Sequence, residues 1–524
     1  MERKTDVLTP DPPVLLHDLL LQTARRCPDR TALVCGASRE SYAALADHAE
    51  RLSRVLLGRG VRRGDRVMTF LPNGAEAVIA FWGCLMADAI VVPVNPLMKT
   101  EKLAELMEDC APVALIADAT LAQVFGPALR RYPIIRAVLL VGETEIPPDL
   151  PHVEGFQAAL DADAGRVSLA RRGLDIDLAA LIYTSGSQGE PKGVMLSHRN
   201  MLSAAASVSH YLELRGDDVI LCLLPLAFDY GLYQMIMSVR QGARLVLERG
   251  FTLPAEVMKR IEAERVTVLP GLPTMFAILA QLKDPSRWDC SSVRTLTSSG
   301  APLPQKHIEH CRVLFPRAVL FSMYGLTECK RCTYLPPELL AKKPGSVGIA
   351  IPNTELWVVD EAGNRLGPNQ VGELVIRGAT VMQGYWHKPE ATDRCLKPGP
   401  LPGERVLYTG DLCRLDEEGC VYFISRMDAV FKTRGEKVAP AEVESVLLAV
   451  PGVREVAVIG IPDPVLGFAV KAFVTPDDGA TLNEVTLRQI CQQHLESFKV
   501  PREIALVASL PRTESGKICR TALA

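Results

Sequence analysis

One short segment of this chain groups hydroxyls and glycines in a way that suits a polyanion. It reads YTSGSQGEPKG, from Tyr183 to Gly193, and places Thr184, Ser185 and Ser187 among glycines at the end of the apolar run DLAALIY. Glycines let the backbone turn tightly and approach a ligand, while amide hydrogens and short hydroxyls donate to several phosphate oxygens at once. We therefore expect the loop to hold the phosphates of a nucleotide triphosphate.

The order of residues in this loop limits the phosphate chemistry it can serve. It differs from the GxxxxGK[ST] pattern of the common phosphate loop, so the loop does not indicate a kinase or motor protein of that type. The same composition also occurs in flexible Ser/Gly linkers, and this is the alternative interpretation when the loop is considered alone.

Further segments along the chain narrow the choice. They are YGLTE at Tyr324–Glu328, YTGD at Tyr408–Asp411, SRMDAVFKTRGEKVAPAEVE at Ser425–Glu444, and PRTESGK, which ends at Lys517. With the loop, and in this order, they resemble the adenylate-forming enzyme superfamily, which includes acyl- and aryl-CoA synthetases, adenylation domains of peptide synthetases and firefly luciferase. The resemblance covers essentially the whole chain and implies ATP and Mg²⁺ as cofactors.

The first reaction of that family sets the demands on the site. A carboxylate attacks the α-phosphorus of ATP and expels pyrophosphate, so the protein must position two anions and neutralise their charge. Thr327 resembles the residue that contacts the α-phosphate and Glu328 the ligand of Mg²⁺, although an isolated Thr-Glu pair can also mark a helix start. The contacts to the β- and γ-phosphates are assigned by resemblance to Thr184, Ser185, Gly186, Ser187, Gly189 and Lys192.

The nucleoside half of ATP is assigned in the same way. By resemblance, Tyr324 stacks on adenine, Asp411 accepts hydrogen bonds from both ribose hydroxyls, and Arg426 makes a second ribose contact. Considered alone, Asp411 or Arg426 could equally be one half of a surface ion pair, which contributes little. The opposite side of the base is assigned to Gly300, Ala301 and Pro302 in the segment SSGAP.

The C-terminal motif provides the residue expected to act most directly on the reaction. Lys517 resembles the family lysine that joins the attacking carboxylate to the α-phosphate, and a point charge on a flexible stem can bridge two such oxygens. In the family, the small domain then rotates, withdraws this lysine and presents the segment that contains Lys432 and Gly435. Gly435 is expected to lie against a pantetheine arm, with a plain turn glycine as the alternative.

The segment LPLAFDYGLYQ bears on which acid is used. Phe228 and Asp229 stand where many related acyl-CoA synthetases carry a histidine, and the pair resembles amino-acid-activating domains, in which the carboxylate pairs with the substrate ammonium. A buried aspartate is costly unless paired, which favours an amine substrate. Asp229 could instead cap a helix that begins near Tyr230, and some acyl-CoA ligase-like proteins also carry FDYG, so acyl substrates stay open. Substrate contacts are assigned to Asp229, Tyr230, Met323 and Cys329, with Ala227, Gly271 and Lys330 as further lining positions.

The large N-terminal part shows the pattern of an α/β fold. Helical patterns near residues 42–57 and 75–86 alternate with short β-branched runs such as DRVMTFL and IVVPV, up to about Met323. This alternation predicts parallel sheets covered by helices on both faces. Ser197 is predicted to cap a helix that starts close behind the phosphate loop, where its dipole could favour an anion.

The C-terminal part has a different character. Beyond Gly345, short strands separated by turn residues predict a small β-barrel-like subdomain. From Gly419 onward, the order strand, strand, helix, strand, strand, helix, strand predicts a small mobile α+β domain of ordinary size. The boundary is placed at Asp428, the position of the family's hinge, which divides the chain into an N-terminal adenylation domain, 1–427, and a C-terminal mobile domain, 428–524.

Bulk composition excludes several classes of protein. The chain has 524 residues, more than one hydrophobic core usually supports, and its formal charge of −3 comes without a long basic run, so nucleic acid is not expected as a partner. No apolar signal core opens the sequence, so we expect a cytoplasmic protein without membrane contact. The 14 cysteines are expected to be reduced, and the CxxC formed by Cys329 and Cys332 lacks the second pair of a zinc site.

These features lead to one favoured function and one alternative. The favoured function is a stand-alone ligase that adenylates a small carboxylic acid, for which an amino acid is favoured, and loads it on the phosphopantetheine thiol of a separate carrier protein. The alternative is an acyl-CoA or aryl-CoA synthetase that uses free CoA. A scaffold protein is disfavoured because Glu328, Asp411, Arg426 and Lys517 are all present, and nothing demands the oxygen chemistry of a luciferase.

Overall fold

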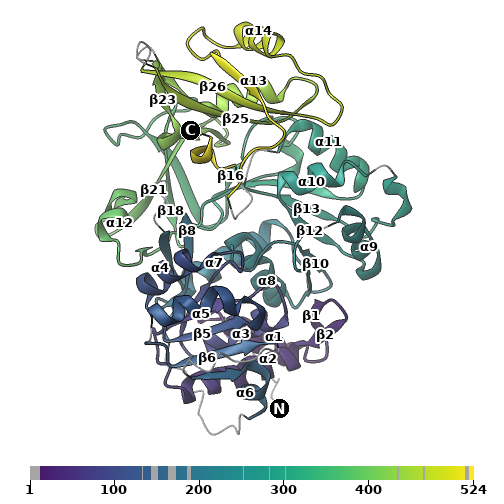
Figure 1. The fold of residues 1–524 in the computed structure, drawn as a ribbon, viewed down its shortest axis with the longest axis vertical. Coiled ribbons are helices and arrows are strands. Elements are labelled where there is room, and N and C mark those ends of the chain that lie inside the picture. Colours follow the sequence, from purple (N-terminus) through teal and green to yellow (C-terminus); the bar gives the residue numbers. More distant parts are fainter. Residues whose placement is uncertain are drawn as a thin grey trace, which may run out of the picture.

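The computed structural model places a small C-terminal domain at one end of a larger body of helices and sheets (Figure 1). In the view of Figure 1, the N-terminal helices and sheets occupy the lower part and the C-terminal domain lies at the top, above α10 (Pro273–Leu279) and α11 (Gln305–Leu314). The structure describes residues 12–132, 134–142, 152–162, 173–185, 191–251, 253–282, 284–300, 303–433, 436–463, 467–513 and 518–523.

The first sheet of the large domain contains eight of the described strands, in the order β19-β9-β8-β4-β3-β5-β6-β7. The strands from β8 to β7 are parallel, whereas β9 and β19 are antiparallel and form one edge. Their bounds are β3 Arg66–Phe70, β4 Ile90–Pro93, β5 Ala114–Asp118, β6 Ala137–Val141, β7 Val153–Gly155, β8 Leu178–Ser185, β9 Pro191–Ser197 and β19 Gly384–Tyr385.

The second sheet contains nine of the described strands, in the order β16-β15-β14-β13-β12-β10-β11-β1-β2. It is parallel from β14 to β1 and antiparallel at both edges, where β15, β16 and β2 lie. Their bounds are β1 Thr31–Cys35, β2 Ser38–Ser41, β10 Val219–Cys222, β11 Arg244–Leu247, β12 Val268–Gly271, β13 Thr295–Ser298, β14 Val319–Tyr324, β15 Thr333–Leu335 and β16 Ile349–Ala350.

Helices cover both faces of these sheets, as the alternating pattern predicts. The helices α2 and α3 match the two predicted near residues 42–57 and 75–86, and every residue of α3 from Val78 to Met86 is buried. A helix buried all round belongs between layers, which is where α3 lies. The helices of this domain are α1 Asp18–Arg26, α2 Tyr42–Gly58, α3 Ala75–Met86, α4 Thr100–Cys110, α5 Ala122–Arg131, α6 Phe156–Asp161, α7 His198–Tyr211, α8 Asp229–Gln241, α9 Pro254–Glu264, α10, α11 and α12 Pro389–Cys395.

The hairpin of β8 and β9 carries the predicted phosphate loop. In the register of β8 and β9, Thr184 lies opposite Lys192 near the loop, and Leu178 lies opposite Ser197 at the far end of the hairpin. Ser197 caps α7 as predicted, since its side chain and that of Asn200 form a capping box. The helix does not start close behind the loop, however, because β9 carries the chain about 20 Å away before α7 begins. That expectation was wrong, and the dipole of α7 cannot serve this loop.

The short strands predicted beyond Gly345 form a five-stranded antiparallel sheet, in which β18 pairs with β17 and β21, and β21 also pairs with β20 and β22. The pairs that the structure describes here form an open sheet. Its strands are β17 Thr354–Val359, β18 Gly372–Gly378, β20 Leu396–Pro398, β21 Arg405–Leu415 and β22 Val421–Arg426.

The C-terminal domain follows the predicted order of elements from β23 onward. Its buried core, which includes Val438, Leu447 and Val474, is a cluster separate from the cores of the large domain. The predicted boundary, Asp428, lies in a single 3₁₀ turn, Met427–Ala429, between β22 and β23. The elements are β23 Phe431–Thr433, β24 Glu436–Val438, α13 Pro440–Leu448, β25 Val453–Asp463, β26 Gly467–Pro476, α14 Glu484–His494 and β27 Glu503–Leu506.

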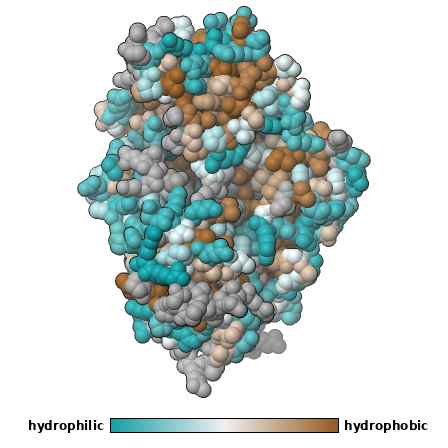
Figure 2. Space-filling model, viewed as in Figure 1, coloured by the Kyte–Doolittle hydropathy of each residue, from teal (hydrophilic) through white to brown (hydrophobic). Residues whose placement is uncertain are grey.

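The surface of the C-terminal domain exposes some large apolar side chains. Figure 2 shows hydrophobic residues gathered over this domain at the top of the view, with hydrophilic ones around them. Phe468 on β26 and Leu506 on β27 are among the exposed hydrophobic residues. Within the ranges that the structure describes, no helix is long and apolar enough to cross a membrane.

Gly231 in α8 provides a test of how tightly the substrate-side helix is packed. A Cβ at this position would lie 2.3 Å from the carbonyl oxygen of Pro225 and 2.7 Å from that of Leu224. Because both atoms belong to the backbone, Gly231→Ala should displace α8 and lower the free energy of unfolding by about 1–3 kcal/mol. Thermal unfolding measures this loss.

The control for Gly231→Ala is another helical glycine. Gly58, the last residue of α2, has no atom within 4 Å of the position of an added Cβ. Gly58→Ala should therefore leave stability unchanged or raise it by up to about 1 kcal/mol. Equal unfolding temperatures for the two variants would show that the contact around Gly231 is not tight.

Candidate active site

Three of the predicted nucleotide residues meet where the ends of β14 and β22 approach the middle of β21. The hydroxyl of Tyr324 donates a hydrogen bond to Oδ2 of Asp411, and Nη1 of Arg426 lies 3.1 Å from Oδ1 of the same carboxylate. Register places Asp411 directly opposite Arg426 across the β21–β22 ladder, so the pairing follows from the sheet itself. The structure thus brings together an aromatic ring, a carboxylate and a guanidinium from motifs far apart in sequence.

The carboxylate of Asp411 has the character of a binding group. Asp411 is 1 % exposed, and this burial raises the pKa of its carboxyl group above the ordinary value. The charge of Arg426 and the hydrogen bond from the Tyr324 hydroxyl act to lower that pKa. Although Oδ1 lies close to Arg426, it has no hydrogen-bond partner of good geometry among the described residues. A buried acceptor without a partner is costly, so a ligand hydroxyl would be stabilised here.

A second group of residues surrounds Glu328. Oε1 of Glu328 accepts a hydrogen bond of 2.7 Å from the hydroxyl of Tyr385, and the Glu328 carbonyl accepts one of 2.7 Å from the amide of Met382. Nζ of Lys192 lies 5.2 Å from the centre of the Tyr385 ring. Glu328 and Lys192 therefore both lie close to Tyr385, at the loop end of the β8–β9 hairpin.

Tyr385 was missed by sequence reasoning. It belongs to β19, a strand of two residues, which is too short to produce a periodic pattern. Burial and the neighbouring Glu328 raise its pKa well above the ordinary value, so it remains a hydrogen-bond donor. The only signal in the sequence is an aromatic pair beside a glycine, QGYW, which by itself indicates a turn.

Removing the Tyr385 hydroxyl should loosen Glu328 without removing its charge. Hydrogen bonds to charged groups contribute about 1.5–3 kcal/mol, so Tyr385→Phe should lower the rate of acid-dependent pyrophosphate release by about tenfold. It should also raise the Mg²⁺ concentration needed for half-maximal rate. Tyr422→Phe, which removes a hydroxyl near Asp416, is the control. An unchanged Mg²⁺ dependence would contradict a role for Tyr385 in orienting Glu328.

These residues provide a donor set that fits ATP and Mg²⁺. Asp411 offers an unused acceptor for ribose, Tyr324 offers an aromatic ring beside it, and Glu328 offers one carboxylate for the metal. Mg²⁺ commonly binds one or two carboxylates together with substrate phosphates, so a single glutamate is a sufficient protein ligand. In the described part of the chain no cluster of three or more His, Cys, Asp or Glu side chains could hold a metal ion.

The substrate-side residues surround the start of α8. This helix begins at Asp229 with Phe228 at the N-cap position, so Asp229 lies in the first turn rather than at the cap. Oδ2 of Asp229 lies 3.1 Å from Nζ of Lys330, which is a buried lysine in the loop after β14. The partner that a substrate ammonium was expected to supply is thus present in the protein.

The other predicted substrate contacts are held in the interior. The hydroxyl of Tyr230 donates to the carbonyl of Thr297 at 2.9 Å, and Sδ of Met323 accepts from the hydroxyl of Tyr211 at 3.0 Å. Sγ of Cys329 lies 3.0 Å from Sγ of Cys332, and both cysteines are fully buried. Tyr230 also belongs to a charged cluster, which consists of Asp229, Tyr230, Tyr233, Lys330 and Arg331.

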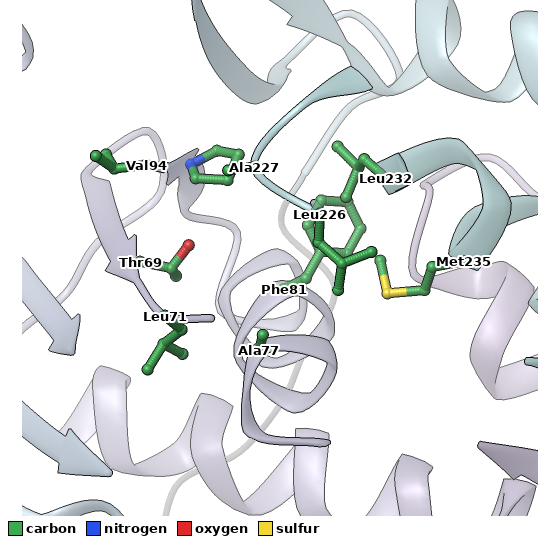
Figure 3. A pocket seen from close by; sticks show the side chains of 10 residues that line it. Thr69, Leu71, Ala77, Phe81, Val94, Leu226, Ala227, Leu232 and Met235 are labelled. Carbon is green, nitrogen blue, oxygen red and sulfur yellow. The ribbon is translucent and has the colours of Figure 1, made fainter. Parts of the chain in front are cut away.

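A separate small cavity lies between the two large sheets (Figure 3). Its volume is about 20 Å³, and it lies between β3, β4 and α3 on one side and α8 on the other. Leu232 and Met235 face it, and the helical period places these two residues on the opposite side of α8 from Tyr230 and Tyr233. The predicted lining residue Ala227 therefore borders this cavity rather than the charged cluster.

Several predicted site residues lie outside the described residues. Thr184 and Lys192 are described, and so is Gly300, whose φ of +92° favours glycine. Lys432 is described only in its backbone, within β23, where it pairs with Lys437 of β24. Outside the description, in whole or in their side chains, are Ser185, Gly186, Ser187, Gly189, Ala301, Pro302, Gly435 and Lys517.

Comparison with protein families identifies the chain. The model of the AMP-binding enzyme family matches residues 20–386, and that of the AMP-binding enzyme C-terminal domain matches residues 442–517. The chain therefore belongs to the AMP-binding enzyme family, the adenylate-forming enzymes, and it uses ATP with Mg²⁺. The superfamily predicted from the motifs is confirmed.

Individual relatives cover the chain almost completely. A feruloyl-CoA synthase from Amycolatopsis is 33% identical over 510 residues, which are 95% of this chain and 96% of the relative. The crystal structure of the anthranilate CoA ligase AuaEII in complex with anthranoyl-AMP superposes with a TM-score of 0.88 at 27% identity, covering 98% of this chain and 97% of that one. ATP-bound MatB from Rhodopseudomonas palustris gives 0.87 at 29% identity, covering 97% and 98%. The chain is similar to acid–thiol ligases throughout its length.

Proposed function

We propose that this protein is an AMP-forming acid–CoA ligase. It joins a carboxylic acid to the thiol of CoA and converts ATP to AMP and pyrophosphate. The observation that carries the proposal is the meeting of Tyr324, Asp411 and Arg426 near Glu328 and Lys192, in a chain similar over its full length to CoA ligases.

The proposed first half-reaction forms an acyl-adenylate. An oxygen of the substrate carboxylate attacks the α-phosphorus, and the bond from that phosphorus to the pyrophosphate oxygen breaks. Asp411 and Tyr324 hold the nucleoside, Thr327 contacts the α-phosphate, and Lys517 bridges the attacking carboxylate and the α-phosphate. Mg²⁺ bound at Glu328 would offset the negative charge that the phosphates carry.

The proposed second half-reaction transfers the acyl group. The sulfur of the CoA thiolate attacks the carbonyl carbon of the acyl-adenylate, and AMP leaves with the electrons of the broken carbon–oxygen bond. Rotation of the C-terminal domain about Asp428 would bring Lys432 and Gly435 to the site. Arg426 connects the proposed hinge to the proposed ribose site, because its Nε lies 3.4 Å from Asp428 and its Nη1 lies 3.1 Å from Asp411.

A second candidate function is an amino acid ligase that loads a carrier protein. The adjacent Phe228 and Asp229 favour it, because they resemble the amine-binding position of amino-acid-activating domains. The pairing of Asp229 with Lys330 weakens its physical basis, since the aspartate already has a cationic partner. The CoA ligase is therefore the preferred function.

A panel of acids and two acceptors distinguishes these functions. Pyrophosphate release is measured with amino acids, aryl acids, fatty acids and dicarboxylic acids, and thioester formation is measured with CoA and with a phosphopantetheinylated carrier protein. Wild type is compared with Asp229→Ala and with Asp393→Ala, which removes an exposed aspartate paired with Arg405. Acyl-CoA formed from amine-free acids supports the proposal. Turnover restricted to an amino acid, lost only in Asp229→Ala and dependent on the carrier protein, would overturn it.

A further inference from the structure

The loop that follows the YGLTE motif carries two consecutive cations into the interior of the protein. Lys330 is 2 % exposed and Arg331 is 3 % exposed. Charged side chains are almost never buried to this extent unless they are paired. Lys330 lies two positions after Glu328, so one loop connects the proposed magnesium ligand to this buried charge.

The backbone of the same loop is held in an unfavourable conformation. Lys330 has φ +35° and Arg331 has φ +70°, the left-handed region that residues with side chains rarely adopt. The loop closes on itself, because the amide of Cys332 donates to the carbonyl of Tyr324 at 2.9 Å. Conformations of this kind persist where a functional constraint outweighs their cost.

The charges within the cluster do not balance. Asp229 is the carboxylate that lies against Lys330, at 3.1 Å. Arg331 has no ion pair and no hydrogen bond with any residue that the structure describes, and its Nε is buried without a partner. Of these two buried cations, Lys330 has a carboxylate partner, whereas Arg331 has none among the described residues. A guanidinium stays protonated at every pH at which the protein is folded, so Arg331 is a permanent positive charge in this cluster.

The position of the guanidinium is fixed by stacking. Cζ of Arg331 lies 4.5 Å from the centre of the Tyr230 ring, and Tyr230 is anchored through its hydroxyl to Thr297 at 2.9 Å. Stacking occupies the face of the guanidinium and leaves its in-plane N–H donors free for a planar acceptor. The hydroxyl of the neighbouring Tyr233 is also buried, and it has no hydrogen-bond partner within the described part of the chain.

We propose that this charged cluster selects a carboxylic acid whose far end bears a second anionic group, which Arg331 binds. The inference rests on the proposed function and names the class of acid that the ligase activates. Burying a guanidinium without a counter-ion is costly, and a substrate that supplies the counter-ion removes the cost only when it is bound. A second carboxylate matches the planar guanidinium in shape, and a sulfonate is the alternative anion.

Matched pairs of acids test this selection. Each dicarboxylic acid is compared with the monocarboxylic acid of the same chain length and with the analogue that carries a terminal sulfonate. Acid-dependent pyrophosphate release gives kcat/KM for each compound in wild type, Arg331→Met and Arg331→Lys. Arg365→Met is the control, since Arg365 also stacks on an aromatic ring, Trp357, but is exposed and paired with Glu355.

The expected result is a preference that depends on Arg331. Wild type should use the dianionic acids about 10–100-fold better than their monocarboxylic partners, the range expected for a charged hydrogen bond. Arg331→Met should lose or reverse that ratio while turnover of monocarboxylic acids is kept, and Arg331→Lys should retain part of it. A wild-type preference for monocarboxylic acids, or an equal loss for both members of each pair in Arg331→Met, would overturn the proposal.

Two readouts separate this inference from the proposed function. Pyrophosphate release reports which acid is activated, whereas acyl-CoA formation reports which thiol accepts the acyl group. Failure to form acyl-CoA would refute the proposed CoA ligase. It would not affect the ratio of kcat/KM between dianionic and monocarboxylic acids, which tests the role of Arg331. The thermal stabilisation of wild type by each acid in the presence of ATP tests selection without turnover. If Arg331→Met does not fold, the wild-type ratios decide, because a monocarboxylic preference alone overturns the inference.

Discussion

Lys517→Ala is expected to lower acid-dependent pyrophosphate release by about 10²–10³, the usual effect of removing one preorganised electrostatic contact to a transition state. The lysine is proposed to join the attacking carboxylate and the α-phosphate, so its ammonium offsets charge that develops only during adenylation. Transfer of the acyl group from supplied acyl-adenylate to CoA should be spared, because that step follows withdrawal of the lysine. The two half-reactions are measured separately in the same preparation.

A surface lysine in the same domain provides the control for Lys517. Lys471 lies on β26 and pairs with Glu503 at 3.0 Å. Lys471→Ala should leave both half-reactions within about twofold of wild type, as expected for an exposed ion pair. Unchanged pyrophosphate release in Lys517→Ala, or equal losses in both half-reactions, would refute the assignment.

Asp411→Asn is expected to raise the KM for ATP by about 10² or more. The carboxylate is buried, accepts from Tyr324 and keeps Oδ1 without a hydrogen-bond partner of good geometry in the described structure. Each hydrogen bond from a ribose hydroxyl to a charged acceptor contributes about 1.5–3 kcal/mol, and the neutral amide loses much of it. The KM for the acid and the rate at saturating ATP should change far less, since Asp411 is expected to contact only the nucleoside.

The control for Asp411 is another aspartate of the same sheet region. Asp416 pairs with Lys343 at 2.9 Å, and the ammonium and nearby backbone amides lower its pKa, although burial acts in the opposite direction. Asp416→Asn should reduce stability without altering the KM for ATP. If both variants change this KM equally, the effect comes from the sheet rather than from the ribose site.

Much of the fold could be predicted from local patterns. The helices α2 and α3 and the Ser197 cap are encoded by residues close together in sequence, namely an apolar period and a side chain that bonds to its own helix. The expected start of α7 behind the phosphate loop failed because β9 separates the two. Periodicity identifies elements, but it does not give the distance between the loop and the helix that follows.

The proposed nucleotide residues could be selected from the sequence for a different reason. Each lies in a short motif whose residue types match one chemical task, as in YGLTE and YTGD. Their meeting could not be read from the motifs, since the pairing of Asp411 with Arg426 depends on the register of β21 and β22. Tyr385 escaped prediction because its hydrogen bond to Glu328 joins two segments that no local pattern connects.

The sequence by itself determined the family of this protein, the cofactors and the general reaction, because those depend on motifs that stay together along the chain. Only the tertiary structure decided the charge balance around Asp229. From the sequence, a buried aspartate indicated a cationic substrate. In the folded chain Lys330 pairs with that aspartate and Arg331 lies buried beside it, so the unmatched charge is positive. Electrostatic complementarity depends on distances between residues about a hundred positions apart, and only folding sets those distances.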